Sequence, residues 1–164
     1  MSRTHLDNAT WGFESNCFVC EATNDQGLRI AFFYDDEADL VSADFTLPAA
    51  FSGAPSYVHG GVTLAILDEA MAWATIASKK AFALTRTTTT TFVRAVKIGS
   101  QYRVEANVSG TTDDGELETH AVVLNDRGKT CAEADARFVV MSAEQAASAI
   151  GTKIEGDDAG YIKG

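Results

Sequence analysis

A proline-free, mainly apolar stretch from Val62 to Ala77 constrains the fold of this chain more than any other feature. It has the length of a helix and carries apolar residues on nearly every face, which predicts a helix that is largely buried. Asp68 lies inside this stretch, about two turns from its start, where an ionised carboxylate without partners is costly to bury. An acid kept at such a position indicates that the protein uses it.

The predicted helix begins at the tripeptide His59-Gly60-Gly61. The first backbone N–H groups of a helix lack partners within the helix, and they favour an anion or an oxygen that gains negative charge. A helix start that can polarise a carbonyl group, with a carboxylate nearby, indicates acyl chemistry.

The spacing of nine positions from His59 to Asp68, directly after His-Gly-Gly, resembles that of the hotdog-fold thioesterases. Within them it is most similar to the phenylacetate-pathway acyl-CoA thioesterases of the 4-hydroxybenzoyl-CoA thioesterase superfamily. Further segments are similar too, and the resemblance covers roughly residues 16 to 141. These segments are Asn16-Cys17-Phe18-Val19-Cys20 with Gly27-Leu28, Gly53-Ala54-Pro55-Ser56-Tyr57-Val58, and Phe92-Val93-Arg94-Ala95-Val96-Lys97-Ile98-Gly99.

The resemblance implies an α+β hotdog fold, in which a curved antiparallel sheet wraps around one long central helix. It implies an acyl-CoA thioesterase in which Asp68 is the nucleophile or the general base that activates water. The Gly61 backbone N–H is the expected oxyanion donor, and Gly60 allows the substrate to approach closely. His59 either polarises or orients the substrate, or holds its loop by hydrogen bonds. The family carboxylate faces the His-Gly-Gly of the partner subunit, so the active site is expected across a dimer interface.

Four further residues are candidates for the site. Thr85 matches a family Ser or Thr that orients the attacking water, although the threonine run at 87–91 needs only strand propensity to explain it. Ser52 stands where many relatives carry Asn, Gln or Glu, and its shorter side chain either lacks that contact or bridges it by water. Arg94 and Lys97 are candidate contacts for the phosphates of coenzyme A, or else exposed cations at a strand end.

Glu69 and the cysteines are not expected to take part in the acyl chemistry. Glu69 lies about 100° around the helix from Asp68, which favours a surface or dimer-interface acid. Cys17-x-x-Cys20 raises the possibility of zinc, but a structural zinc needs four ligands, and only Cys131 and three histidines remain. Free cysteines without a metal are therefore the favoured interpretation, and no cofactor is expected.

Composition limits the partners and the compartment. The formal net charge of −10 argues against nonspecific binding to nucleic acid or to an anionic membrane, so the phosphates of coenzyme A need a local basic patch. No apolar run of membrane-spanning length is free of charge, and residues 1–15 lack the apolar segment of a signal peptide. Three cysteines favour a reducing compartment, so a cytoplasmic protein is expected.

The 164 residues suit a single domain, with an irregular lead at 1–25 containing Trp11, Phe13 and Phe18, a core at about 26–141 and a tail at 142–164. The tail is expected to contain a short helix at 142–149 and a mobile end. Because a helix and open strand edges need cover, a homodimer or a dimer-of-dimers tetramer is expected. The predicted strands are 28–34, 40–47, 85–96, 102–109, 116–124 and 132–140, with the long helix at about 60–80 between the second and third.

Two other functions compete with hydrolysis. A hotdog dehydratase acting on enoyl-CoA would use a different His/Asp pattern, which this sequence lacks. A non-catalytic acyl-CoA-binding module would gain little from a buried acid at position 68. For a thioesterase, arene, medium-chain and short-chain acyl groups all stay open as substrates.

Overall fold

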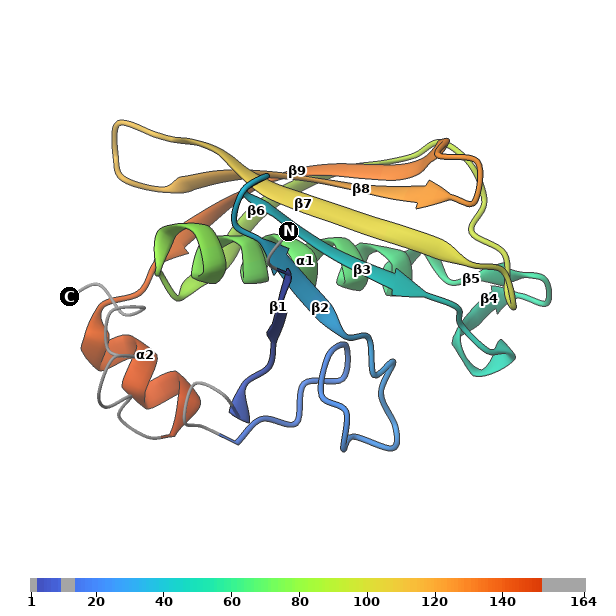
Figure 1. The fold of residues 1–164 in the computed structure, drawn as a ribbon, viewed down its shortest axis with the longest axis horizontal. Helices are drawn as coiled ribbons and strands as arrows, with labels where there is room; N and C mark the ends of the chain where they lie inside the picture. The colour runs from blue at the N-terminus through green and yellow to red at the C-terminus, as the bar shows by residue number, and fades with distance from the viewer. Residues whose placement is uncertain (1–2, 10–13, 152–164) are drawn as a thin grey trace.

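A computed structural model describes residues 3–9 and 14–151, which form a curved antiparallel sheet packed on one long helix (Figure 1). The sheet has seven strands in the order β1-β2-β3-β7-β8-β9-β6, and a two-stranded hairpin of β4 and β5 lies beside it. The strands are β1 Arg3–Leu6, β2 Phe32–Asp35, β3 Leu40–Phe45, β4 Ser52–Ala54, β5 Tyr57–Val58, β6 Ala83–Phe92, β7 Tyr102–Thr111, β8 Leu117–Asn125 and β9 Thr130–Val140. The helices are α1 Gly60–Lys79 and α2 Ala143–Ile150, with a short 3-10 turn at Ala49–Phe51.

The three long strands β7, β8 and β9 form a meander through tight turns at 112–116 and 125–129. Buried and partly exposed residues alternate along each of them, as a sheet with one face against a core requires. Gly115 and Gly128 adopt positive φ angles of 83° and 69° in these two turns, a conformation that glycine reaches without strain.

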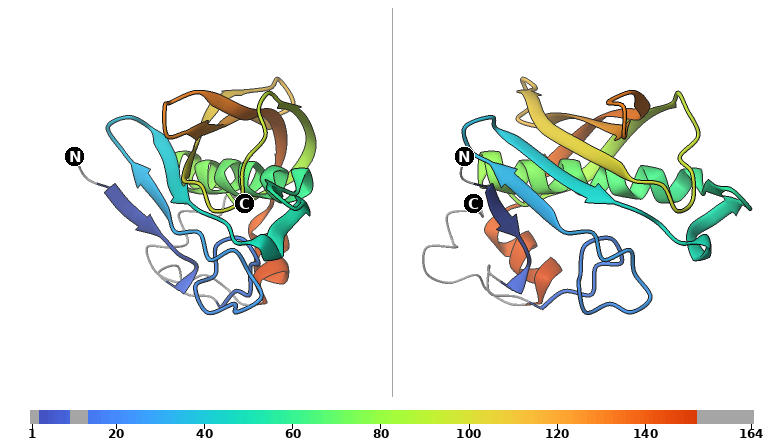
Figure 2. Two further views of the ribbon diagram at one scale, coloured as in Figure 1. Left: turned by 90° about the vertical axis from the view of Figure 1, so that its right-hand side faces the viewer. Right: turned by 45° about the vertical axis from the view of Figure 1, so that its right-hand side comes forward.

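Helix α1 lies on the concave face of the sheet, which curls around it (Figure 2). Ten of its residues are buried, among them Ile66, Leu67 and Met71, which are fully buried in the core. By length and hydropathy alone this helix would be long and apolar enough to cross a membrane. Its packing against the sheet explains the same composition, because a helix covered on most sides can be apolar on most sides.

The predicted fold class is confirmed, and most of the predicted elements have the positions expected. The lead is not wholly irregular, however. Residues Arg3–Leu6 form β1, which pairs antiparallel with β2 and extends the sheet by one strand. The first predicted strand begins later than expected, at Phe32, and the β4–β5 hairpin was not predicted.

The short helix predicted in the tail is present as α2. Ser142 accepts a hydrogen bond from the Gln145 backbone N–H while the Gln145 side chain returns one to the Ser142 backbone, a reciprocal cap that fixes the helix start. Trp11 and Phe13, expected to anchor the lead, and the tail end at 152–164 lie outside the described residues.

Candidate active site

Asp68 and Thr85 form the centre of the candidate site. The Thr85 hydroxyl donates a hydrogen bond to Asp68 Oδ1 at 2.6 Å, which joins the middle of α1 to the start of β6. Asp68 is partly exposed and Thr85 is exposed, so this face of the helix is open in the single chain. The sequence predicted a buried acid; in the single chain Asp68 instead lies on an accessible face, with a hydroxyl as its partner.

His59 caps the start of α1. Its ring Nδ1 accepts a hydrogen bond of 2.8 Å from the Gly61 backbone N–H. Because Nδ1 accepts, the neutral ring carries its proton on Nε2. A Cβ atom at position 61 would lie 3.1 Å from this Nδ1, so glycine there gives the ring room to cap the helix.

This cap changes which backbone N–H is free. The Gly61 N–H, the expected oxyanion donor, is already bonded to His59, so it could serve a substrate only if the ring moved away. The Gly60 N–H has no hydrogen-bond partner among the described residues, and Gly60 lies on the wall of a cavity of about 290 Å³. The role of Gly61 stays a prediction, and Gly60 is the better-placed donor in this state.

Asp68 and the helix start are far apart within one chain. Eight residues at a rise of about 1.5 Å each separate Gly60 from Asp68 by about 12 Å along α1. A reacting atom has to lie within about 3–3.5 Å of the group that attacks it. One carbonyl group therefore cannot reach both Asp68 and Gly60 of the same chain.

A larger cavity of about 740 Å³ opens next to the small one, and the two share Tyr57, Arg94 and Ala95 on their walls. Arg94 and Lys97, which the sequence singled out, both line it, and Arg127 adds a third cation. In a chain with a formal net charge of −10, three cations around one cavity form a local basic site. Arg127 was missed because the motif around it, Asn-Asp-Arg-Gly, reads only as a turn.

Ser52 lies in β4, and its side chain is exposed. The backbone beside it holds the helix start, since the Phe51 carbonyl accepts a hydrogen bond from the His59 backbone N–H at 2.9 Å. No hydrogen bond joins the Ser52 side chain to Asp68 or to His59 among the described residues. Its expected contact with water or substrate stays a prediction.

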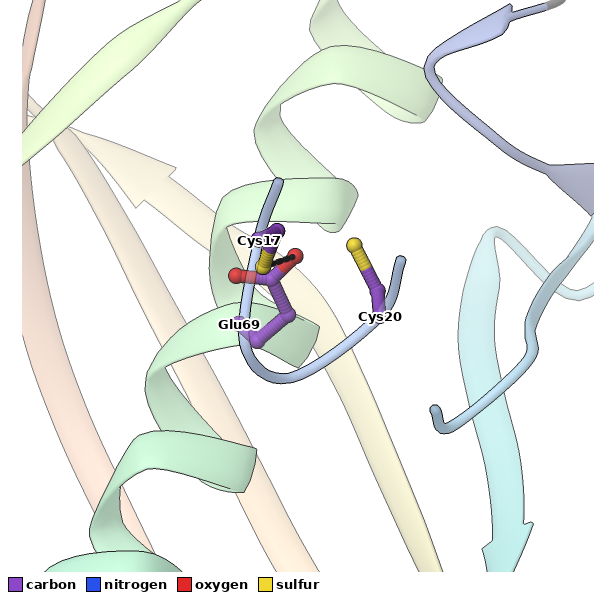
Figure 3. A group of neighbouring side chains, drawn as sticks. All are labelled: Cys17, Cys20 and Glu69. Carbon is purple, nitrogen blue, oxygen red and sulfur yellow. Dashed lines mark hydrogen bonds between the residues drawn. The ribbon is translucent and has the colours of Figure 1, made fainter. Parts of the chain in front are cut away.

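Glu69, expected as a surface or dimer-interface acid, is partly buried against the lead. Its side chain leaves α1 about 100° around the helix from Asp68 and points toward Cys17 and Cys20 (Figure 3). The Cys17 sulfur and Glu69 Oε1 are 3.4 Å apart. Sequence reasoning counted cysteines and histidines around the Cys-x-x-Cys motif and missed this acid, which is 52 positions away in the chain.

The ionisation of these three groups is shifted by their contacts. A hydrogen bond from Cys20 lowers the pKa of the Cys17 thiol to about 5. The same contact, together with burial, raises the pKa of Cys20. Burial is also the main cause that raises the pKa of the Glu69 carboxyl to about 8.

Comparison with known proteins found one matching family model. Residues 56–114 match the family model of the thioesterase superfamily, a segment that includes His59, Asp68, Thr85, Arg94 and Lys97. No curated protein matches the chain.

Several solved structures share the fold. A crystal structure of a thioesterase superfamily protein is 20% identical with a TM-score of 0.66, and the match covers 71% of this chain but only 56% of that one. A phenylacetic acid degradation-related protein from Ralstonia eutropha JMP134 is 24% identical, with a TM-score of 0.60 and coverage of 70% and 86%. The protein smu.793 from Streptococcus mutans UA159, bound to acetyl-CoA, is 16% identical, with a TM-score of 0.58 and coverage of 63% and 82%.

The family match covers 59 of the 164 residues, and the sheet topology and central helix are those of the matched structures. The chain therefore has the hotdog fold and contains a segment similar to the thioesterase superfamily.

Proposed function

We propose that this protein hydrolyses acyl-CoA thioesters to the free acid and coenzyme A. The observation that carries the proposal is the Asp68 carboxylate, held by the Thr85 hydroxyl at 2.6 Å on an accessible face of α1. A carboxylate that is fixed but open to substrate can attack a carbonyl carbon or take a proton from water. A module that only binds acyl-CoA has no use for such a group.

In the proposed reaction, the thioester oxygen is stabilised at the start of α1 as it gains negative charge. The free Gly60 N–H and the positive end of the helix dipole supply that stabilisation, and the Gly61 N–H joins them if the His59 ring turns away. Asp68 acts as nucleophile or as general base. Single-turnover hydrolysis in heavy-oxygen water tests direct attack, which forms a mixed anhydride and releases coenzyme A. If water then attacks the Asp68 carboxyl carbon, the first acid released carries an unlabelled Asp68 oxygen and the label stays on Asp68.

The coenzyme A moiety is proposed to lie in the basic cavity. Arg94, Lys97 and Arg127 offer cations for phosphate groups, and the shared wall of the two cavities leads from there to Gly60. The acetyl-CoA in the Streptococcus mutans structure agrees with a coenzyme A ligand for this fold. The acyl group then points past the helix start, away from the cations.

We infer that the active site is completed by a second copy of the chain. The separation of about 12 Å between Gly60 and Asp68 along α1 supports a site in which the helix start and the carboxylate at one thioester come from different protomers. Strand β6 is the matching edge: it is paired on one side only, with β9, and most of its residues are exposed. An unpaired edge of this length is a template for symmetric association.

The test is hydrolysis of a panel of acyl-CoA thioesters, followed by release of free thiol, with wild type and Asp68→Asn measured together. We expect the variant to lose about 10²- to 10⁴-fold in rate while it still binds coenzyme A. Asp113→Asn, which makes the same change in an exposed turn, is the matched control and keeps full activity. Full activity in Asp68→Asn would refute the role of Asp68. Binding of coenzyme A without hydrolysis of any thioester by wild type would identify a binding module instead.

A further inference from the structure

Cys17, Cys20 and Glu69 form a cluster that the proposed hydrolysis does not use. The two cysteine sulfurs and a Glu69 carboxylate oxygen all lie within 4.8 Å of one another (Figure 3). They come from two separate parts of the chain, the lead and the middle of α1. Both cysteines are free thiols.

We propose that Cys17, Cys20 and Glu69 bind a zinc ion that fastens the lead to α1. Two thiolates and one carboxylate make a donor set that suits Zn²⁺ among the common divalent metals. With metal–sulfur bonds of about 2.3 Å and a metal–oxygen bond of about 2.1 Å, a tetrahedral site has a sulfur–oxygen edge of about 3.6 Å. The observed distance of 3.4 Å between Cys17 Sγ and Glu69 Oε1 matches that edge without rearrangement.

The backbone around the cysteines is already arranged to hold a metal. The Val19 N–H points at the Cys17 sulfur, 3.4 Å away, and such a donor stabilises a thiolate. The turn is fixed by hydrogen bonds from the Leu28 N–H to the Phe18 carbonyl at 2.6 Å and from the Ile30 N–H to the Val19 carbonyl at 2.9 Å. Binding would therefore not require the chain to order itself first.

Glycine at position 27 is part of the same arrangement. A Cβ atom there would lie 2.5 Å from the Phe18 carbonyl oxygen, so any other residue would force this turn apart. The close approach keeps the segment after the cysteines tight against the turn that carries them.

Glu69 has no competing cation. Among residues 3–9 and 14–151, no lysine or arginine forms an ion pair with it. A partly buried carboxylate whose neighbours are two thiols lacks the counter-charge that burial normally demands, and Zn²⁺ would supply it.

A fourth ligand is available. The Asn8 side-chain amide lies 4.0 Å from Cys20 Sγ, and half a rotation of that amide would present its oxygen to the cluster. Because Cys17, Cys20 and Glu69 are all only partly buried, water can reach the same position. Either donor completes four-coordination, and zinc uptake displaces the thiol protons.

The experiment uses the full chain, purified under reducing conditions and stripped with a chelator. It is titrated with Co²⁺ as a spectroscopic probe and with Zn²⁺ as competitor. We expect one ion per chain, thiolate-to-cobalt charge-transfer absorption, displacement by Zn²⁺ with a Kd below about 1 μM, and a higher unfolding temperature with zinc bound.

Variants assign the ligands. Cys17→Ser and Cys20→Ser should each abolish the charge-transfer band or weaken binding at least 100-fold, and Glu69→Gln should weaken binding at least 10-fold. Cys131→Ser, which removes the third cysteine from β9, is the matched control and binds as wild type does. Asp68→Asn should also bind as wild type does, so the metal site and the hydrolytic site are tested separately.

The proposal is overturned if reduced wild type binds no Zn²⁺ at micromolar concentration, or if binding persists in the Cys17→Ser/Cys20→Ser double variant. Formation of a Cys17–Cys20 disulfide in place of metal binding under reducing conditions also overturns it. Because the wild-type titration alone can give the first result, the proposal stays testable even if a cysteine variant fails to fold.

Discussion

The Thr85 hydroxyl donates a hydrogen bond to the Asp68 carboxylate at 2.6 Å, which links the core helix α1 to the edge strand β6 of the sheet. Thr85 sits just before an irregularity in the β6–β9 register, between Thr85 and Thr87. A hydroxyl on this strand fixes one carboxylate oxygen and leaves the other to face a substrate or a water molecule. The contact distinguishes Thr85 from the threonines at 87–91, none of which forms a hydrogen bond with Asp68 among the described residues.

Replacement of Thr85 by Val should lower kcat by roughly 10- to 100-fold, because a hydrogen bond to a charged group contributes about 1.5–3 kcal/mol. Thr85→Ser keeps the hydroxyl and should stay within about threefold of wild type, a change well below 1 kcal/mol. Steady-state hydrolysis of one acyl-CoA substrate measures both. A Val variant with wild-type kcat would show that the hydroxyl does not hold Asp68 for catalysis.

The cap at His59 should be visible in stability. His59→Ala removes the acceptor of the Gly61 N–H and should lower the free energy of unfolding by about 0.5–2 kcal/mol. His59→Asn restores a good capping side chain and should recover most of that loss. Urea titrations at one fixed protein concentration measure both variants.

The same two variants distinguish two roles of His59: capping the helix start and contacting the substrate. If the His59→Asn variant is as stable as wild type but loses activity, the ring itself contacts the substrate, through the proton on Nε2. If its activity also recovers, His59 serves only to hold the helix start. Equal stability of His59→Ala and wild type would contradict the cap.

The basic cavity should discriminate coenzyme A esters from shorter thioesters. In Lys97→Ala/Arg127→Ala, the loss of two exposed charge contacts of about 0.5–1 kcal/mol each should raise KM for acyl-CoA by roughly 5- to 30-fold. We expect kcat to stay unchanged, because these groups bind ground state and transition state alike. A pantetheine thioester, which lacks the nucleotide, should show no change.

The control for that variant is Lys79→Ala/Lys129→Ala, which removes the same charge outside the cavity lining. It should leave KM for acyl-CoA as in wild type. An equal rise of KM in both double variants would mean that overall charge, not this cavity, attracts the substrate.

The sequence predicted the core elements well because their patterns are strong and local. The all-round apolar stretch predicted α1 to within a residue at each end, and the alternation in β7, β8 and β9 predicted three strands and their turns. Strand β1 was missed because Arg-Thr-His-Leu has no alternation and is held only by pairing with β2.

The details of the site depend on contacts between distant residues. Nothing in the spacing of Cys17 and Glu69 indicates that they meet, since the approach of the lead to α1 is set by the whole fold. The His59 ring likewise takes the N–H of Gly61 through a side-chain orientation that a sequence pattern does not encode. By contrast, the family resemblance singled out both Asp68 and Thr85 as site residues, and the structure joins them by a hydrogen bond that the resemblance did not predict.

The exposed edge of β6 leads to the prediction that tests the assembly. Leu84 is 60% exposed, and its cross-strand neighbour Val139 is 40% exposed, an apolar pair that a single chain leaves in water. Leu84→Glu should convert a dimeric wild type into a monomer and remove most of the hydrolysis, because the proposed site takes Asp68 and a helix start from different chains. Light scattering after size-exclusion chromatography, with activity measured on the same fractions, follows both effects.

The control is Phe18→Glu, which makes a similar change at a residue of the lead that is 53% exposed. This variant should leave the dimer and the activity intact. A monomeric wild type with full activity, or a dimeric and active Leu84→Glu, would show that β6 is not the interface on which the site depends.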